Sequence, residues 1–152
     1  IGYIIPATQE AHHSDGFDKQ VRKTEKEELS VFKSTLNFKL DTELSGNEQF
    51  PSNGEVFVFI VQYFASDKEY RKRDVDNMAK TILDVLKNRL YKDDSQVKTL
   101  LVGKKLEKRV PQNFAYVAIK RLRSSQDVDA LKISGLERSV TMFQELKSKK
   151  VL

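Results

Sequence analysis

Two aspartates that precede an expected helix have the spacing needed to hold a metal ion. Asp74 and Asp76 stand two residues apart where an extended segment enters the helix, so their carboxylates can point to one side. Convergent carboxylates repel each other and raise each other's pKa, and a divalent cation removes that penalty. Oxygen-only ligands suit Mg²⁺ or Mn²⁺ rather than zinc. Such an ion can activate water and stabilise the charge that develops in phosphodiester cleavage.

Lys80 lies one helical turn beyond Asp76, and two interpretations of it stay open. It could reach the acidic site and stabilise a pentacovalent phosphate or the leaving oxygen. It could equally form an ordinary ion pair with Asp76 or Asp84, worth about 0.3–0.5 kcal/mol. The adjacent Asp93 and Asp94 follow the helix and could add a third carboxylate.

The length of this helix decides whether Asp94 can join Asp74 and Asp76 within one chain. A helix over 77–87 would be about 16 Å long, and the residues up to Asp94 could span at most about 23 Å. A helix that continued to Leu90 would be about 21 Å long and leave a link of about 13 Å, which favours a carboxylate from a dimer partner. We expect the shorter helix and a site within one chain.

Several other chemistries are excluded by the residues present. The chain has no cysteine, so disulfides, thiolate zinc sites and cysteine nucleophiles are absent. A calcium loop of the EF-hand type starting at Asp74 would need oxygen and glycine where Met78 and Ala79 stand. There is no glycine-rich phosphate loop, and the only two histidines, His12 and His13, stand together in an expected loop.

The basic charge is concentrated around the same motif. The net charge is +5, and residues 68–109 hold 13 Lys/Arg against 7 Asp/Glu. A focused basic surface attracts polyanions and could bind nucleic acid through its phosphates, although a solvated lysine-rich face is the alternative. No apolar run is long enough to span a membrane, and we expect a cytoplasmic protein.

The hydrophobic pattern predicts a mixed α/β domain with a small sheet of three or four strands. We expect a short strand at Tyr3–Ile5 and a two-sided, central strand over 55–65, because that run is β-branched and aromatic. The other expected elements are a helix over 25–39 opened by a Thr24–Glu27 capping box, a loop over 41–54, a helix opened by an Asp76 cap, a hairpin of strands 97–102 and 114–121, and a helical tail over 125–150.

The motif becomes specific when it is taken as a whole string. Arg-Lys-Arg-Asp-Val-Asp-Asn at 71–77 is followed by Lys80, then Ile-Leu-Asp-Val-Leu at 82–86 and Tyr-Lys-Asp-Asp-Ser-Gln-Val at 91–97. This string closely resembles the core signature of the RusA family of Holliday-junction resolvases. The dense match covers 71–98, and the later lysines and the strand over 114–121 fit more loosely. The resemblance predicts a nuclease domain over 1–124, with residues 125–152 as a tail of the same unit.

What the resemblance implies is a homodimeric, Mg²⁺- or Mn²⁺-dependent endonuclease that cuts four-way DNA junctions symmetrically. The residues that match its acidic and lysine positions are Asp74, Asp76, Asp94 and Lys80, with Asp93 as an outer neighbour of the metal. The expected phosphate contacts are Arg71, Lys72, Arg73, Lys104 and Lys105.

The chain also departs from this pattern. Family members usually carry a loop rich in Gly, Pro and Arg near the amino terminus, whereas residues 6–19 contain no arginine and include three acidic residues. A non-catalytic DNA-binding module of the same fold and a protein-interaction role for the tail are therefore alternatives. Binding to phosphates should weaken steeply with salt, which separates DNA binding from protein binding.

Overall fold

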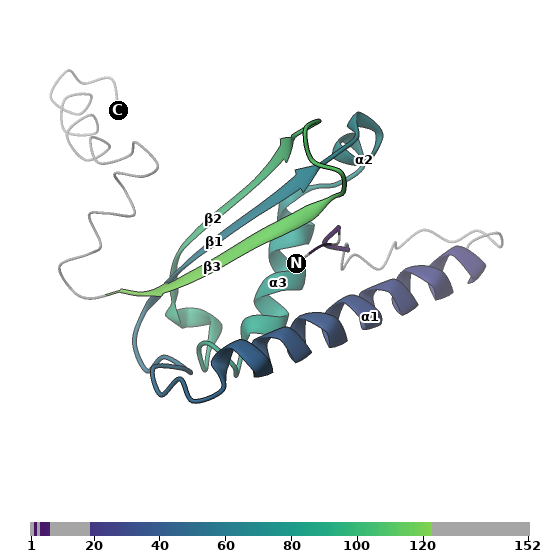
Figure 1. The fold of residues 1–152 in the computed structure, drawn as a ribbon. Helices are drawn as coiled ribbons and strands as arrows, with labels where there is room; N and C mark the ends of the chain where they lie inside the picture. Colours follow the sequence, from purple (N-terminus) through teal and green to yellow (C-terminus); the bar gives the residue numbers. More distant parts are fainter. Residues whose placement is uncertain (1, 3, 7–18, 123–152) are drawn as a thin grey trace, which may run out of the picture.

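The computed structural model describes residues 2, 4–6 and 19–122, with side chains from residue 27 onward in the first helix. The elements are α1 (Lys19–Leu44), β1 (Val56–Phe64), α2 (Asp67–Arg71), α3 (Val75–Leu86), the 3-10 helix η1 (Asp94–Gln96), β2 (Val97–Leu106) and β3 (Phe114–Arg121). They form two layers, a three-stranded sheet with α1 and α3 on one face (Figure 1). The expected mixed α/β class is confirmed, while the expected tail over 125–150 and the histidine loop lie outside the described residues.

Strand β1 lies in the centre of the sheet, which has the order β2-β1-β3. It runs parallel to β2, with Ile60 opposite Val102, and antiparallel to β3, with Ile60 opposite Val117. A parallel pair needs a crossover, and α2 and α3 supply it. The expected hairpin of β2 and β3 is therefore wrong: the most apolar strand takes the centre and separates them. The connection between them passes the end of β1, where the Glu107 amide donates to the Phe64 carbonyl at 2.8 Å.

The two faces of β1 differ in burial. Its alternate residues from Val56 to Phe64 are 0% exposed and face the helices, whereas the residues between them are partly exposed. The expectation of a strand buried on both faces is thus met on one face only. On the opposite face, Tyr63 stacks on Phe114 and Phe59 meets Tyr116 edge-on.

The core forms between this buried face and apolar stripes of the two long helices. Helix α1 contributes Phe32 and Leu36, and α3 contributes Met78, Ile82 and Leu86 at helical spacing. Each such side chain stabilises the fold by roughly 1.5–3 kcal/mol when fully buried. Helix α1 begins at Lys19, before Thr24, so the predicted capping box does not open it and the helix is longer at both ends than expected. Among the described residues, no helix is long and apolar enough to cross a membrane.

The segment expected as a first strand does not join the sheet. Ile5 is fully buried, and its amide donates to the side-chain oxygen of Gln62 at 2.8 Å. The Thr81 hydroxyl donates to the Pro6 carbonyl at 2.7 Å. Two buried side chains therefore satisfy backbone groups that a strand ladder would otherwise satisfy.

Candidate active site

The amino-terminal end of α3 presents two neighbouring carboxylates. Asp74 is the N-cap residue of α3 and Asp76 lies in the first turn, and both are exposed. An N-cap aspartate usually accepts a hydrogen bond from an amide of the first turn, but the Asp74 side chain makes no such bond. Within the described part of the chain, neither carboxylate has a hydrogen bond or an ion pair. Both therefore keep their oxygens for a ligand.

Lys80 is exposed one turn further along α3. Neither of the ion pairs that could have explained it is present among the described residues. Asp84 instead lies 3.7 Å from the ammonium of Lys33 on α1. Lys80 therefore follows Asp76 by one turn on the same face of α3, without an ion-pair partner among the described residues.

The third predicted aspartate lies at the other end of α3. Helix α3 ends at Leu86, as the shorter prediction required, because Lys87 leaves helical geometry and Asn88 adopts a left-handed φ of 66°. Asp94 opens η1, and its carboxylate accepts a hydrogen bond from the Lys87 ammonium at 2.7 Å. This bond raises the pKa of Lys87.

The Asp93 side chain stabilises the turn between α3 and β2 through local hydrogen bonds. Its carboxylate caps η1 by accepting a hydrogen bond from the Ser95 amide at 2.9 Å, and bonding to Ser95 holds its pKa below the usual value. Gln96 completes a capping box by accepting a hydrogen bond from the Asp93 amide. Asp93 therefore acts as a structural cap at the position where Asp94 is presented.

Two independent lengths show that Asp94 is far from Asp74 and Asp76 in the same chain. Helix α3, with 12 residues, separates them by about 18 Å along its axis. The ammonium of Lys104 binds the carbonyl of Arg73, and Lys104 lies about 23 Å along β2 from Val97, next to η1.

The expected convergence of three aspartates within one chain is therefore not found. No group of three acidic, histidine or cysteine side chains in the described residues could hold a metal ion. The link after α3 is long enough to return, but it folds against the end of its own helix. The Asn88 amide donates to the Tyr91 carbonyl at 2.7 Å, and the Tyr91 hydroxyl donates to the Leu83 carbonyl at 2.9 Å.

The basic triplet before Asp74 has acidic neighbours. The Arg71 side chain pairs with Asp67 at 2.7 Å, and the Lys72 ammonium lies 3.9 Å from Glu69. Both pairs are on the surface and contribute little to stability, so a phosphate could displace the carboxylates. The expectation that Arg71 and Lys72 contact DNA thus stays a prediction that the geometry permits.

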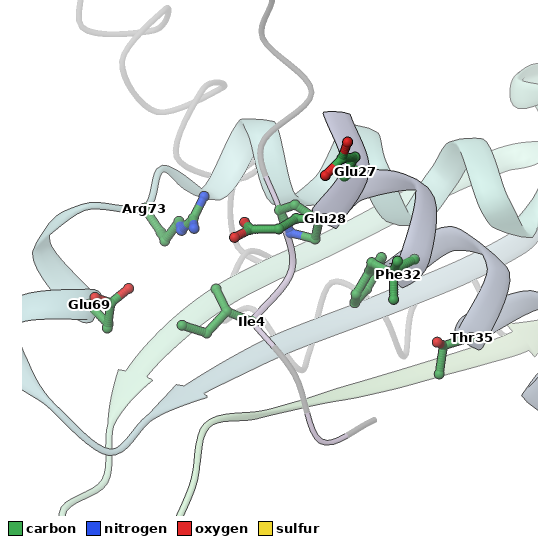
Figure 2. A pocket seen from close by; sticks show the side chains of 9 residues that line it. Ile4, Glu27, Glu28, Phe32, Thr35, Glu69 and Arg73 are labelled. Carbon is green, nitrogen blue, oxygen red and sulfur yellow. The ribbon is translucent and has the colours of Figure 1, made fainter. Parts of the chain in front are cut away.

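Arg73 lines a pocket of about 570 Å³ between α1, the amino-terminal segment and the α2–α3 turn (Figure 2). Its Nε is buried and has no hydrogen-bond partner among the residues that the structure describes. The pocket also has carboxylates on its walls and apolar side chains between them. The other lining residues are Ile4, Pro6, Glu27, Glu28, Val31, Phe32, Thr35 and Glu69.

The two predicted phosphate contacts on β2 lie on opposite faces of the sheet. Lys104 pairs in register with the buried Gln62, and its ammonium binds the carbonyls of Tyr70 and Arg73. Lys105 is exposed and pairs with Tyr63 on the face without helices. The sequence alone does not indicate that Lys87 binds Asp94 or that Lys104 binds backbone carbonyls. These groups come together only in the tertiary fold.

Comparison with known proteins identifies a family for this chain. The family model described as "Endodeoxyribonuclease RusA" matches residues 13–120, which include α3, η1, β1, β2 and all of β3 except Arg121. Neither the curated proteins nor the solved structures give a match to the chain. The family match covers well over half of the sequence and contains both acidic ends of α3. The chain therefore belongs to the RusA family, the endodeoxyribonucleases that resolve Holliday junctions.

Proposed function

We propose that this protein is a Mg²⁺- or Mn²⁺-dependent resolvase of four-way DNA junctions that works as a homodimer. The observation that carries the proposal is the pair of exposed carboxylates of Asp74 and Asp76 at one end of α3, which have no partner in the described part of the chain. They lie beside a basic triplet and Lys80 in a chain of the RusA family. Carboxylate oxygens are the ligands that Mg²⁺ prefers in proteins, so these donors fit the ion.

We propose further that each metal site is completed across the dimer. Asp94 lies at the opposite end of α3 from Asp74 and Asp76, at a distance that one metal ion cannot bridge. A two-fold axis that sets the two α3 helices antiparallel would bring Asp94 of one chain to Asp74 and Asp76 of the other. It would create two equivalent sites, which suits paired cuts in a junction with two-fold symmetry.

The side chains then have distinct tasks. Asp74 and Asp76 of one chain and Asp94 of the other would hold the ion, and Asp94 would give up its hydrogen bond from the Lys87 ammonium to do so. When bound, the ion would supply an activated water and charge stabilisation at the phosphate. Lys80 would donate to the phosphate oxygens or the leaving oxygen as negative charge builds up there. Asp93 keeps η1 in the shape that presents Asp94.

Basic residues would hold the junction through its backbone. Arg71 and Lys72 stand three and two residues before Asp74, so phosphate contacts there would place the scissile bond near the carboxylates. Lys105 offers a further cation on the open face of the sheet. Such contacts position the DNA without reading its sequence, and their affinity should fall steeply with salt.

The test is cleavage of a supercoiled plasmid that extrudes a cruciform, in the presence of Mg²⁺, with linear duplex and flap substrates as controls. Wild-type protein should cut both strands and give linear plasmid, whereas Asp76→Asn and Asp94→Asn should each give none. Cutting of flaps and duplex at equal rates would keep the nuclease but remove its junction selectivity. Salt-sensitive junction binding without any cleavage would favour a DNA-binding module of the same fold.

Mixing the two inactive variants tests the shared site. After subunit exchange, a dimer of Asp76→Asn with Asp94→Asn contains one fully damaged site and one intact site, so about a quarter of the sites in a random mixture recover. Because one intact site makes one nick, nicked circles should accumulate instead of linear plasmid. If each site lay within one chain, the mixture would stay as inactive as its components.

A further inference from the structure

The joint between α2 and α3 carries Asp74, but it lacks the capping interactions that usually fix the ends of helices. The Asp74 side chain does not cap α3, and the C-cap residue of α2, Lys72, is not a glycine in a left-handed conformation. Helix α2 has only 5 residues and no buried residue. A short, exposed helix of this kind has little local stability, so something outside the joint must define its position.

The ammonium of Lys104 supplies that contact from the sheet. It donates to the Tyr70 carbonyl at 3.0 Å and to the Arg73 carbonyl at 2.8 Å, and it lies 4.5 Å from the centre of the Tyr70 ring. Tyr70 in turn meets Phe64 edge-on at the end of β1. The carbonyls at a helix end have no partner inside the helix, and a cation stabilises them both as a donor and through the helix dipole.

We propose that Lys104 is a positioning residue for the metal site: it fixes the α2–α3 joint so that the Asp74 and Asp76 carboxylates keep one arrangement. The inference rests on the proposed function, because its purpose is to hold metal ligands. Its ammonium uses two of its three N–H donors on backbone carbonyls, which reassigns Lys104 from contacting phosphate to supporting the site. Asp74, relieved of capping, then keeps its oxygens for the ion.

The test compares Lys104→Met with Lys104→Arg and with Lys105→Met, a matched lysine on the opposite face of the same strand. Three quantities are measured: amide hydrogen exchange of Tyr70, Lys72 and Met78, the Mg²⁺ concentration for half-maximal cleavage, and junction affinity as a function of salt. The first and third do not depend on cleavage. Denaturant unfolding confirms that each variant is folded, and Lys104→Gln replaces Lys104→Met if the latter is not.

We expect Lys104→Met to speed exchange at these three amides by about tenfold relative to the β1 amides and to raise the Mg²⁺ requirement. A small displacement of ligands can cost up to about a hundredfold in rate. Junction affinity and its salt dependence should stay unchanged, and Lys104→Arg should restore part of the exchange protection. Lys105→Met should instead weaken junction binding and reduce the salt slope by about one, without changing exchange.

Two outcomes would overturn the assignment. One is that Lys104→Met behaves like Lys105→Met, with a smaller salt slope and unchanged exchange, because that marks a phosphate contact. The other is that cleavage, metal requirement and exchange all match wild type. If wild-type protein cleaved no junction with any divalent cation, the proposed function would fail by itself, and the exchange data would still decide whether Lys104 holds the joint.

Discussion

The two ends of α3 both carry aspartates, but these aspartates differ in whether their side chains have partners. At the amino-terminal end, Asp74 and Asp76 have no side-chain partner among the described residues, and the joint before them is held mainly by Lys104. At the carboxyl-terminal end, Asp94 is paired with Lys87 and Asp93 is used as a cap. One end therefore offers carboxylates without partners next to a joint that one lysine holds, whereas the other offers a paired carboxylate on a turn held by several side-chain hydrogen bonds.

The difference indicates where stability and chemistry reside. Substitutions at the carboxyl-terminal end should change the free energy of unfolding. The turn there is hydrogen-bonded to the segment before β1 through Gln96 and to α3 through Tyr91. Substitutions of the carboxylates at the amino-terminal end should change metal binding and leave stability nearly unaltered, since exposed residues without partners contribute within about 0.5 kcal/mol.

The largest effect on stability should come from Gln96→Ala. The Gln96 side chain donates to the carbonyls of Ser52 and Gly54, both at 2.9 Å, and accepts from the amides of Lys92 and Asp93. At about 0.5–1.5 kcal/mol for each bond, with partial replacement by water, the free energy of unfolding should fall by about 2 kcal/mol.

Chemical denaturation measures this loss, and Gln49→Ala at an exposed position of the preceding loop serves as the control. A loss for Gln96→Ala no larger than that for the control would contradict the view that this turn is firmly held.

An intermediate effect is expected for Tyr91→Phe. The buried Tyr91 hydroxyl donates to the Leu83 carbonyl at 2.9 Å, so its removal should cost about 1 kcal/mol at neutral pH. Burial raises the pKa of Tyr91 to about 12, above its ordinary value of about 10 in unfolded chains. Between pH 10 and 12 the unfolded chain loses this proton and the folded chain keeps it, so wild-type stability should fall through that range.

Tyr91→Phe lacks this contribution and should lose less stability over the same alkaline range. Unfolding free energies measured from pH 8 to 12 test the point. Parallel curves for the two proteins would mean that Tyr91 ionises as freely in the folded state as in the unfolded chain.

The smallest change in stability should follow Lys87→Met. The ion pair of Lys87 with Asp94 is on the surface and contributes little to stability. Its loss frees Asp94, so on the proposed function the Mg²⁺ concentration for half-maximal cleavage should fall by up to about fivefold, the change in affinity expected for a surface ion pair. Lys92→Met removes a nearby exposed cation that has no ion pair with Asp94 and is the control. A higher Mg²⁺ requirement in Lys87→Met would show that Lys87 supports the metal site instead of competing with it.

Sequence reasoning predicted the parts of the fold that local patterns determine. The expected strand over 55–65 agrees with Val56–Phe64 to within one residue at each end, and the expected 114–121 agrees with β3 fully. The order of the strands was missed, because nothing in the local pattern of β2 or β3 says that a third strand lies between them. The short helix α2 was missed as well, since its 5 residues carry no buried side chain.

The choice of site residues stays a prediction, whereas their expected arrangement within one chain is not found among the described residues. The motif points to the aspartates and Lys80, and the chain-length estimate allowed Asp94 to return to Asp74. The return fails because Asn88 adopts a left-handed conformation and Tyr91 packs back on α3, and neither event has a glycine or proline to signal it. The length of an extended segment gives only the maximum distance that it can span, and the packing of the segment decides the distance that it does span.

Helix α3 also sets which insertions and deletions the chain can accept. Its two ends carry the two halves of the proposed site, and one residue added within it would rotate one end by about 100° relative to the other and shift it by about 1.5 Å. Insertions and deletions within residues 75–86, even of one residue, should therefore be excluded from functional homologues. The mostly exposed segments 45–49 and 108–112 join α1 to β1 and β2 to β3 outside the site, so they should vary more freely in length.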